Sequence, residues 1–220
     1  MATSAIYLHG FASSPQSAKA RYFADRLRRR GLAVTIPDLN YPSFSAMTVS
    51  AQVELVTSIL DESQEKKLLF GSSMGGLVAA LASKRSEQAL AMVLLAPGFG
   101  IEQRWSDVTG AERMRLWRQQ GELPFFHYGA EREEMLSWSF IADLERWRTT
   151  DLELTVPTLI LHGKNDEIVP VKYSIEIREY NPDTVELQVL EDGHDLHASL
   201  ETMWQLTEQF LDDSVFRNVD

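Results

Sequence analysis

Short apolar runs alternate with amphipathic segments along the first hundred residues. A short run rich in aliphatic and β-branched residues, bounded by turn signals, is typical of a buried strand. Such runs predict four strands, at Ala5–Gly10, Leu32–Asp38, Lys67–Gly71 and Leu90–Pro97. The segments between them repeat apolar residues at helical spacing and predict three helices, at 14–31, 49–60 and 77–84. Strands and helices in this order are typical of a parallel sheet covered on both faces.

The rhythm stops at Gly98 and resumes after about residue 150. No strand-like run is visible between these points, and two helical patterns cover 111–120 and 131–147. Beyond them, strands are predicted at Pro157–Gly163 and Val185–Asp192, and helices at 169–180 and 196–211. We therefore expect residues 1–220 to form a single α/β domain. Its central sheet should be mostly parallel, with a helical lid inserted at residues 98–150.

Composition narrows the function classes. Of the 220 residues, 44% are hydrophobic and 24% are charged, which is ordinary for a globular protein. The formal net charge of −11 opposes binding to nucleic acid or to an anionic membrane. The absence of cysteine excludes disulfides, thiolate catalysis and zinc–thiolate sites. No zinc-protease motif occurs, and His194 and His197 form only an isolated pair, so we expect no metal and no cofactor.

Targeting signals are not apparent. The first residues lack the basic and apolar regions of a secretory leader. The longest apolar run, Leu90–Pro97, is far shorter than the ~20 residues that cross a bilayer. These features suggest a cytoplasmic protein without a membrane span, and they do not indicate an oligomeric state.

The segment Gly71-Ser72-Ser73-Met74-Gly75 follows a predicted strand and precedes a predicted helix. In that position, G-x-S-x-G indicates a sharp turn that exposes its central serine at the carboxyl edge of the sheet. The helix that follows directs its first N–H groups toward a developing anion. Ser73 is therefore the candidate nucleophile. The alternative is that the glycines and serines merely form a turn.

A serine nucleophile needs a base, and the base needs an orienting acid. Asp166 follows the strand at Pro157–Gly163, and His194 follows the strand at Val185–Asp192. The chain order Ser, Asp, His is the one found in α/β hydrolases. Because the carboxyl ends of parallel strands share one edge of the sheet, the three side chains should meet there.

Each role has rivals along the chain. Ser72, Ser13 and Ser14 compete with Ser73 for the role of nucleophile. His197 competes with His194, and the neighbouring carboxylates compete with Asp166, which is alternatively only a turn residue. Those carboxylates are Glu167, Asp192 and Asp195. His162 ends a strand and is expected to hydrogen-bond locally.

The stretches "IYLHGFASSPQSAKA" and "GSSMGG" resemble small bacterial esterases of the YqiA type, and nearly the whole chain resembles the α/β-hydrolase superfamily. The resemblance implies a serine hydrolase that cleaves a small acyl ester or thioester through an acyl-enzyme. The backbone N–H of Met74, which follows the nucleophile, should supply one oxyanion donor. By the same resemblance the N–H of Phe11, or alternatively of Ala12, supplies the other.

The pocket is less defined by the sequence. His9 and the insertion's Trp105 and Trp138 are candidate substrate contacts, although His9 can instead brace its loop and the aromatics can instead form the lid's own core. An arginine of the insertion facing the pocket would recognise a carboxylate or phosphate. Two alternative functions stay open: the same three residues acting on a C–C, peptide or acyl-CoA bond, or a binding module without turnover.

Overall fold

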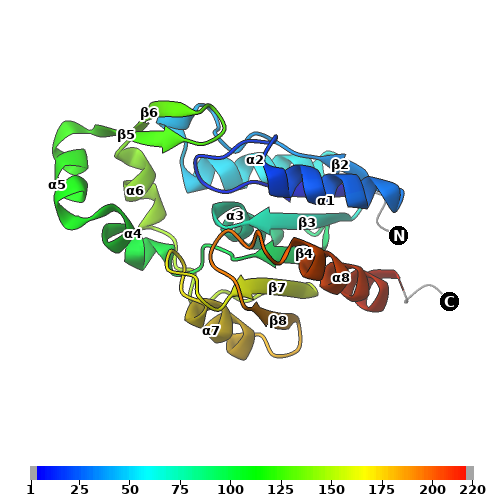
Figure 1. Cartoon of the computed structure of the whole chain (residues 1–220). Helices are drawn as coiled ribbons and strands as arrows, with labels where there is room; N and C mark the ends of the chain where they lie inside the picture. Colours follow the sequence, from blue (N-terminus) through cyan, green and yellow to red (C-terminus); the bar gives the residue numbers. More distant parts are fainter. Residues whose placement is uncertain (1–3, 217–220) are drawn as a thin grey trace.

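The computed structural model describes residues 4–216 and is built on six parallel strands (Figure 1). Their order across the sheet is β2-β1-β3-β4-β7-β8. The strands are β1 (Ser4–Leu8), β2 (Ala33–Thr35), β3 (Lys67–Ser72), β4 (Ala89–Leu95), β7 (Thr158–Gly163) and β8 (Val185–Leu190). The mostly parallel sheet that the sequence predicts is confirmed.

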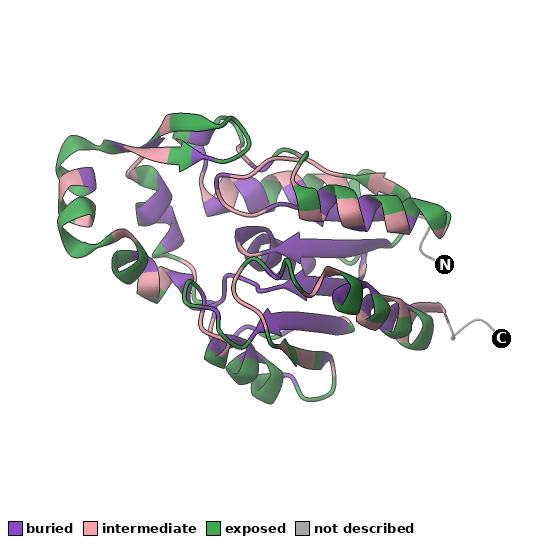
Figure 2. Cartoon of the chain, viewed as in Figure 1, coloured by how far each residue is buried: buried purple, intermediate pink, exposed green. Residues whose placement is uncertain are grey.

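Burial explains which strands the sequence predicts well. Every residue of β3 and β7 is buried, so these strands read as continuous apolar runs (Figure 2). The edge strand β2 is different because it pairs only with β1 and is largely exposed. It ends at Thr35, before Pro37, which lacks the N–H that a longer ladder would need. The strand is therefore shorter than the predicted segment Leu32–Asp38.

Helices cover both faces of the sheet. Helices α1 and α8 pack on one face, around Phe23, Phe70 and Trp204. Helices α2, α3 and α7 pack on the other face, where the larger core lies. The five helices are α1 (Ala18–Arg29), α2 (Val49–Asp61), α3 (Met74–Ser83), α7 (Lys172–Tyr180) and α8 (Leu200–Leu211). All five lie within the helical segments that the hydrophobic spacing predicts or overlap them closely.

The insertion, defined as residues 98–150, stands beyond the carboxyl ends of the strands (Figure 1). It holds three helices and an antiparallel hairpin: α4 (Ile101–Thr109), α5 (Ala111–Gln120), β5 (Glu122–His127), β6 (Arg132–Ser137) and α6 (Ser139–Leu144). The prediction of a helix at 111–120 is confirmed. The helix predicted at 131–147 is present only as the shorter α6, and the prediction of no strands in the insertion is wrong.

The physical reason for the hairpin is long-range pairing. Gly121, with φ of 80°, ends α5 and turns the chain into β5. Leu123 of β5 pairs with Leu136 of β6, and both are buried. The indole N–H of Trp117 donates to the Leu136 carbonyl at 2.8 Å. These contacts fix β6 as a strand although its residues favour a helix.

Polar contacts tie the insertion to the sheet domain at α6 and join the two ends of the insertion to each other. The buried Asp143 of α6 accepts from the backbone N–H of Ser50 at 2.8 Å and from its hydroxyl at 2.6 Å, in the first turn of α2. Where the insertion begins and ends, the Thr149 hydroxyl donates to Glu102 at 2.8 Å and accepts from the Gly100 N–H at 2.7 Å. The two ends of the insertion therefore lie side by side.

Candidate active site

Ser73 lies on the turn between β3 and α3, in a backbone conformation that non-glycine residues rarely adopt. Its φ is 54° and its ψ is −118°. The Ser73 N–H donates to the Leu95 carbonyl at 2.9 Å, and its carbonyl accepts from Gly98 N–H at 2.9 Å. These bonds to β4 and the segment after it hold the strained turn in place.

Two glycines make the turn sterically feasible. A Cβ on Gly71 would lie 2.4 Å from the Gly75 carbonyl oxygen. A Cβ on Gly75 would lie 2.2 Å from the Leu8 carbonyl oxygen of β1. Backbone atoms occupy both positions, so neither site accepts a side chain without displacing the turn. The G-x-S-x-G spacing thus has a direct steric cause.

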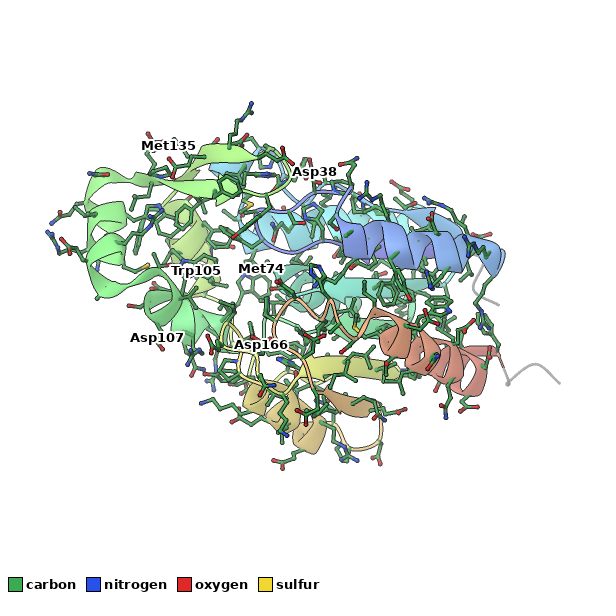
Figure 3. All side chains as sticks on the ribbon, in the orientation of Figure 1. Asp38, Met74, Trp105, Asp107, Met135 and Asp166 are labelled. Carbon is green, nitrogen blue, oxygen red and sulfur yellow. The ribbon has the colours of Figure 1, made fainter. Side chains whose placement is uncertain are left out.

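His194 joins Ser73 to Asp166. Its Nε2 lies 2.9 Å from Ser73 Oγ, and its Nδ1 lies 2.6 Å from Asp166 Oδ2. Because an ionised carboxylate only accepts, Nδ1 carries the proton and Nε2 is left to accept from the serine hydroxyl. The structure therefore brings together the three side chains that the sequence singles out, at the carboxyl edge of the sheet, where Figure 3 labels Asp166 and Met74.

Asp166 is held by donors on both carboxylate oxygens. Oδ1 accepts from the N–H groups of Ile168 at 2.9 Å and Val169 at 2.8 Å. Oδ2 faces His194 and also lies 3.2 Å from His162 Nε2. Burial alone would raise the pKa of Asp166, but the hydrogen bonds from His162, His194 and Val169 outweigh it and lower the pKa well below its usual value. The carboxylate stays ionised beside His194.

The rival residues are not part of the hydrogen-bonded chain from Ser73 to Asp166. Ser72 is buried within β3, and Ser13 and Ser14 belong to the loop after β1. His197 is exposed. Asp192 accepts from the N–H and hydroxyl of Ser199 at 3.0 and 2.9 Å, which shapes the loop around His194. The exposed Glu167 and Asp195 have no hydrogen bond to His194 within residues 4–216.

The N–H groups of Phe11 and Met74 have no protein acceptor among the residues that the structure describes, and neither has the N–H of Ala12. Met74 is the first residue of α3, where helix N–H groups are free to bind an anion. Residues of other segments hydrogen-bond to the loop that carries Phe11. Asn40 Nδ2 donates to the Ser13 carbonyl at 2.9 Å, and the Gly129 N–H donates to the Ala12 carbonyl at 3.4 Å. The second contact comes from the tip of the β5–β6 hairpin.

His9, a candidate substrate contact, points into the protein. The side chain is 1% exposed, and Nε2 accepts from the Leu39 N–H at 3.0 Å. Nδ1 lies 2.9 Å from the Gly10 carbonyl, to which it donates. Both ring nitrogens are engaged, so His9 braces the loop after β1. Burial leaves it no side on which to contact substrate.

The two candidate tryptophans have different surroundings. Trp105, labelled in Figure 3, is a residue of α4. It is 8% exposed, and its ring centroid lies 5.1 Å from that of Phe11. Its indole N–H is buried without a partner among residues 4–216. Trp138 instead stacks edge-on against Trp117, at 5.6 Å, within the insertion. Trp105 therefore lies beside the candidate site, and Trp138 belongs to the insertion's own core.

The insertion's arginines mostly pair with their own neighbours. Arg104 lies 3.6 Å from Asp107, Arg132 lies 2.7 Å from Glu134, and Arg148 lies 3.3 Å from Asp151. None of these ion pairs includes Ser73, His194 or Asp166. An arginine of the insertion that recognises a substrate anion stays a prediction.

Within residues 4–216, no cluster of three or more His, Asp or Glu side chains is arranged to hold a metal ion. No helix in the same part of the chain is both long and apolar enough to cross a membrane. At the carboxyl edge of the sheet, hydrogen bonds run from Ser73 through His194 to Asp166.

A parallel sheet covered on both faces, with a serine on the sharp turn after β3, is the arrangement of the α/β-hydrolase fold. The family model described as "Uncharacterised protein family (UPF0227)" matches residues 4–211, and the chain belongs to this family.

Two curated relatives are named palmitoyl-protein thioesterase ABHD10, mitochondrial. The mouse protein is 32% identical over 131 residues, which are 56% of this chain and 43% of the relative. The protein of Rattus norvegicus is 31% identical over 156 residues, 67% of this chain and 51% of the relative. The chain thus spans about half the length of the curated relatives it matches.

Solved structures agree on the fold. Alpha/beta hydrolase domain-containing protein 10 from mouse has a TM-score of 0.78 and 24% identity, covering 96% of this chain and 90% of that one. Est1E from Butyrivibrio proteoclasticus has a TM-score of 0.75 and 19% identity, covering 98% of this chain and 89% of that one. At such identities the likeness shows the fold.

Proposed function

We propose that this protein is a serine hydrolase of the carboxylesterase type, which cleaves a small acyl ester or thioester. The observation that carries the proposal is the position of His194, 2.9 Å from Ser73 Oγ on one side and 2.6 Å from Asp166 on the other. The names of the two curated relatives, both thioesterases, support the same bond type. The cytoplasmic location suggested by the sequence stays a prediction.

In the acylation step, Ser73 Oγ attacks the acyl carbonyl carbon while His194 Nε2 takes the hydroxyl proton. Asp166 stabilises the imidazolium that forms and keeps the ring in the required tautomer. The carbonyl oxygen becomes an oxyanion, for which the N–H groups of Met74 and Phe11 are the proposed donors. Each such donor is worth roughly 3–4 kcal/mol in the transition state.

The tetrahedral intermediate then expels the alcohol or thiol, which leaves with the proton from His194 Nε2. Water enters the acyl-enzyme, and His194 removes one of its protons as the oxygen attacks the acyl carbon. Return of that proton to Ser73 Oγ releases the carboxylic acid and restores the free enzyme. Every step uses side chains already in hydrogen-bonding contact.

The test is the variant Ser73→Ala, with Ser72→Ala as the matched control. We expect Ser73→Ala to lose at least about 10⁴-fold in kcat for p-nitrophenyl acetate and butyrate, because the nucleophile is gone. Ser72→Ala should keep turnover and should still react with a fluorophosphonate probe, which labels only an activated serine. Loss of fluorophosphonate labelling in Ser72→Ala but not in Ser73→Ala, or full turnover by Ser73→Ala, contradicts the proposal.

A substrate panel then defines the acyl group and the leaving group. Acyl esters and CoA thioesters from acetyl to palmitoyl separate a short-chain esterase from a long-chain thioesterase. The palmitoyl members test whether this chain shares the substrate class in its relatives' names. A wild-type protein that neither turns over any member nor reacts with the probe would be a binding module.

A further inference from the structure

We propose that His162, which takes no part in the proposed reaction, is a positioning residue that orients Asp166 toward His194. This inference rests on the proposed function of Ser73, His194 and Asp166. It deepens that proposal by adding a second, completely buried histidine that contacts the acid.

His162 is completely buried near the carboxyl end of β7, four residues before Asp166. Its Nδ1 lies 2.7 Å from the hydroxyl of Ser174, a fully buried residue of α7. Its Nε2 lies 2.8 Å from the Val169 carbonyl and 3.2 Å from Asp166 Oδ2. One ring therefore connects the sheet, the helix α7 and the loop that carries the acid.

The partners determine which ring nitrogen carries the proton. The Val169 carbonyl and the Asp166 carboxylate are acceptors only, so Nε2 must be the donor. Nδ1 then accepts from the Ser174 hydroxyl, and every polar atom of the ring is satisfied. The Nε2–H donates mainly to Val169, and its positive end also faces Asp166 Oδ2.

This arrangement constrains Asp166 in two ways. The bond to the Val169 carbonyl fixes the turn whose N–H groups, from Ile168 and Val169, hold Oδ1. The proximity of Nε2–H to Oδ2 stabilises the ionised carboxylate, in line with the lowered pKa of Asp166. Together they leave Oδ2 directed at His194 Nδ1 at 2.6 Å.

The test compares His162→Gln with His162→Asn. The Gln amide reaches the position of Nε2, so it keeps a donor for Val169 and Asp166 and gives up the contact with Ser174. The shorter Asn amide sits at the position of Nδ1, so it keeps the contact with Ser174 and gives up the donor. The two variants are both polar and differ in the one interaction at issue.

We expect the Asn variant to move the acidic limb of the kcat/KM profile to higher pH by about 0.5–1 unit. The carboxylate loses a donor that favours its ionised form, so the hydrogen-bonded pair to which it belongs binds a proton more tightly. The rate should fall by roughly 10-fold. In the Gln variant the acidic limb of the kcat/KM profile should lie at the same pH as in the wild type. Ser174→Ala, the matched control for lost stability, should leave the limb unchanged. The other charged groups near the pair, which are Lys19, Asp192 and Asp195, are present in all variants.

Identical limbs in wild type and both His162 variants, or equal shifts in both, overturn the inference. If the Asn variant does not fold, ¹⁵N NMR of the unmodified protein decides: His162 must show the Nε2–H tautomer, and the Nδ1–H tautomer overturns the inference. An inactive wild type that also fails to react with fluorophosphonate marks failure of the proposed function instead, since the NMR result does not depend on turnover.

Discussion

At the scale of single residues, the site depends on one buried carboxylate. The Asp166 side chain is inaccessible to solvent, yet its pKa is lowered rather than raised. Donors from Ile168, Val169, His162 and His194 outweigh the cost of burial. Since its folded-state pKa lies below that of the unfolded chain, ionised Asp166 stabilises the fold above the unfolded pKa. This contribution is lost as the pH falls through the folded pKa.

Replacing Asp166 by Asn should therefore lower the free energy of unfolding near neutral pH by roughly 1–3 kcal/mol, because two buried N–H donors and His194 face a weaker acceptor. The difference from wild type should shrink below about pH 4, as the wild-type carboxylate begins to be protonated on unfolding. Urea denaturation of both proteins from neutral pH to about pH 3 measures it. Asp195→Asn, an exposed neighbour, is the control, and a difference constant with pH would contradict the argument.

At the scale of elements, the sequence predicts a helix or strand correctly where the element's own residues specify it. It fails where contacts with a distant segment specify the element. Strand β3 and helix α2 are specified by their own apolar patterns, and the turn that carries Ser73 is specified by its glycines. Strand β6 reads as helical because Glu133, Glu134 and Met135 favour helices. Only pairing with β5 makes it a strand. The contact between His162 and Asp166 was missed for a similar reason, since it depends on how the loop after β7 folds back.

Among elements, α6 is bonded to α2 through a single buried carboxylate. Asp143→Ala should lower the free energy of unfolding by about 1–3 kcal/mol, because the Ser50 N–H and hydroxyl lose their acceptor. Proteolytic cleavage within the insertion should become faster. Limited proteolysis followed by mass spectrometry measures the sites and rates. Asp151→Ala, which removes only an exposed ion pair with Arg148, should change neither quantity. Unchanged cleavage in Asp143→Ala would show that apolar packing alone holds α6.

At the scale of the whole molecule, one core spans the sheet and the insertion. Phe11 of the loop after β1 lies within 5.9 Å, between ring centroids, of both Phe125 of β5 and Phe140 of α6. The same buried cluster contains Leu69 of β3 and Trp117 of α5. Because these contacts are continuous, separating the insertion from the sheet would expose apolar surface on both sides. The insertion should therefore unfold together with the sheet, as part of a single domain.

Tryptophan fluorescence can test this cooperativity. Four of the five tryptophans, all but Trp204, lie in the insertion. In a Trp204→Phe variant, fluorescence therefore reports on the insertion, while far-UV circular dichroism reports on all elements. One cooperative unit predicts that the two urea transitions coincide. Phe is a conservative replacement because Trp204 packs against Phe23, with 6.1 Å between ring centroids. A fluorescence transition at lower urea concentration would mean that the insertion opens independently, and Phe11 would then lose its aromatic neighbours before the sheet unfolds.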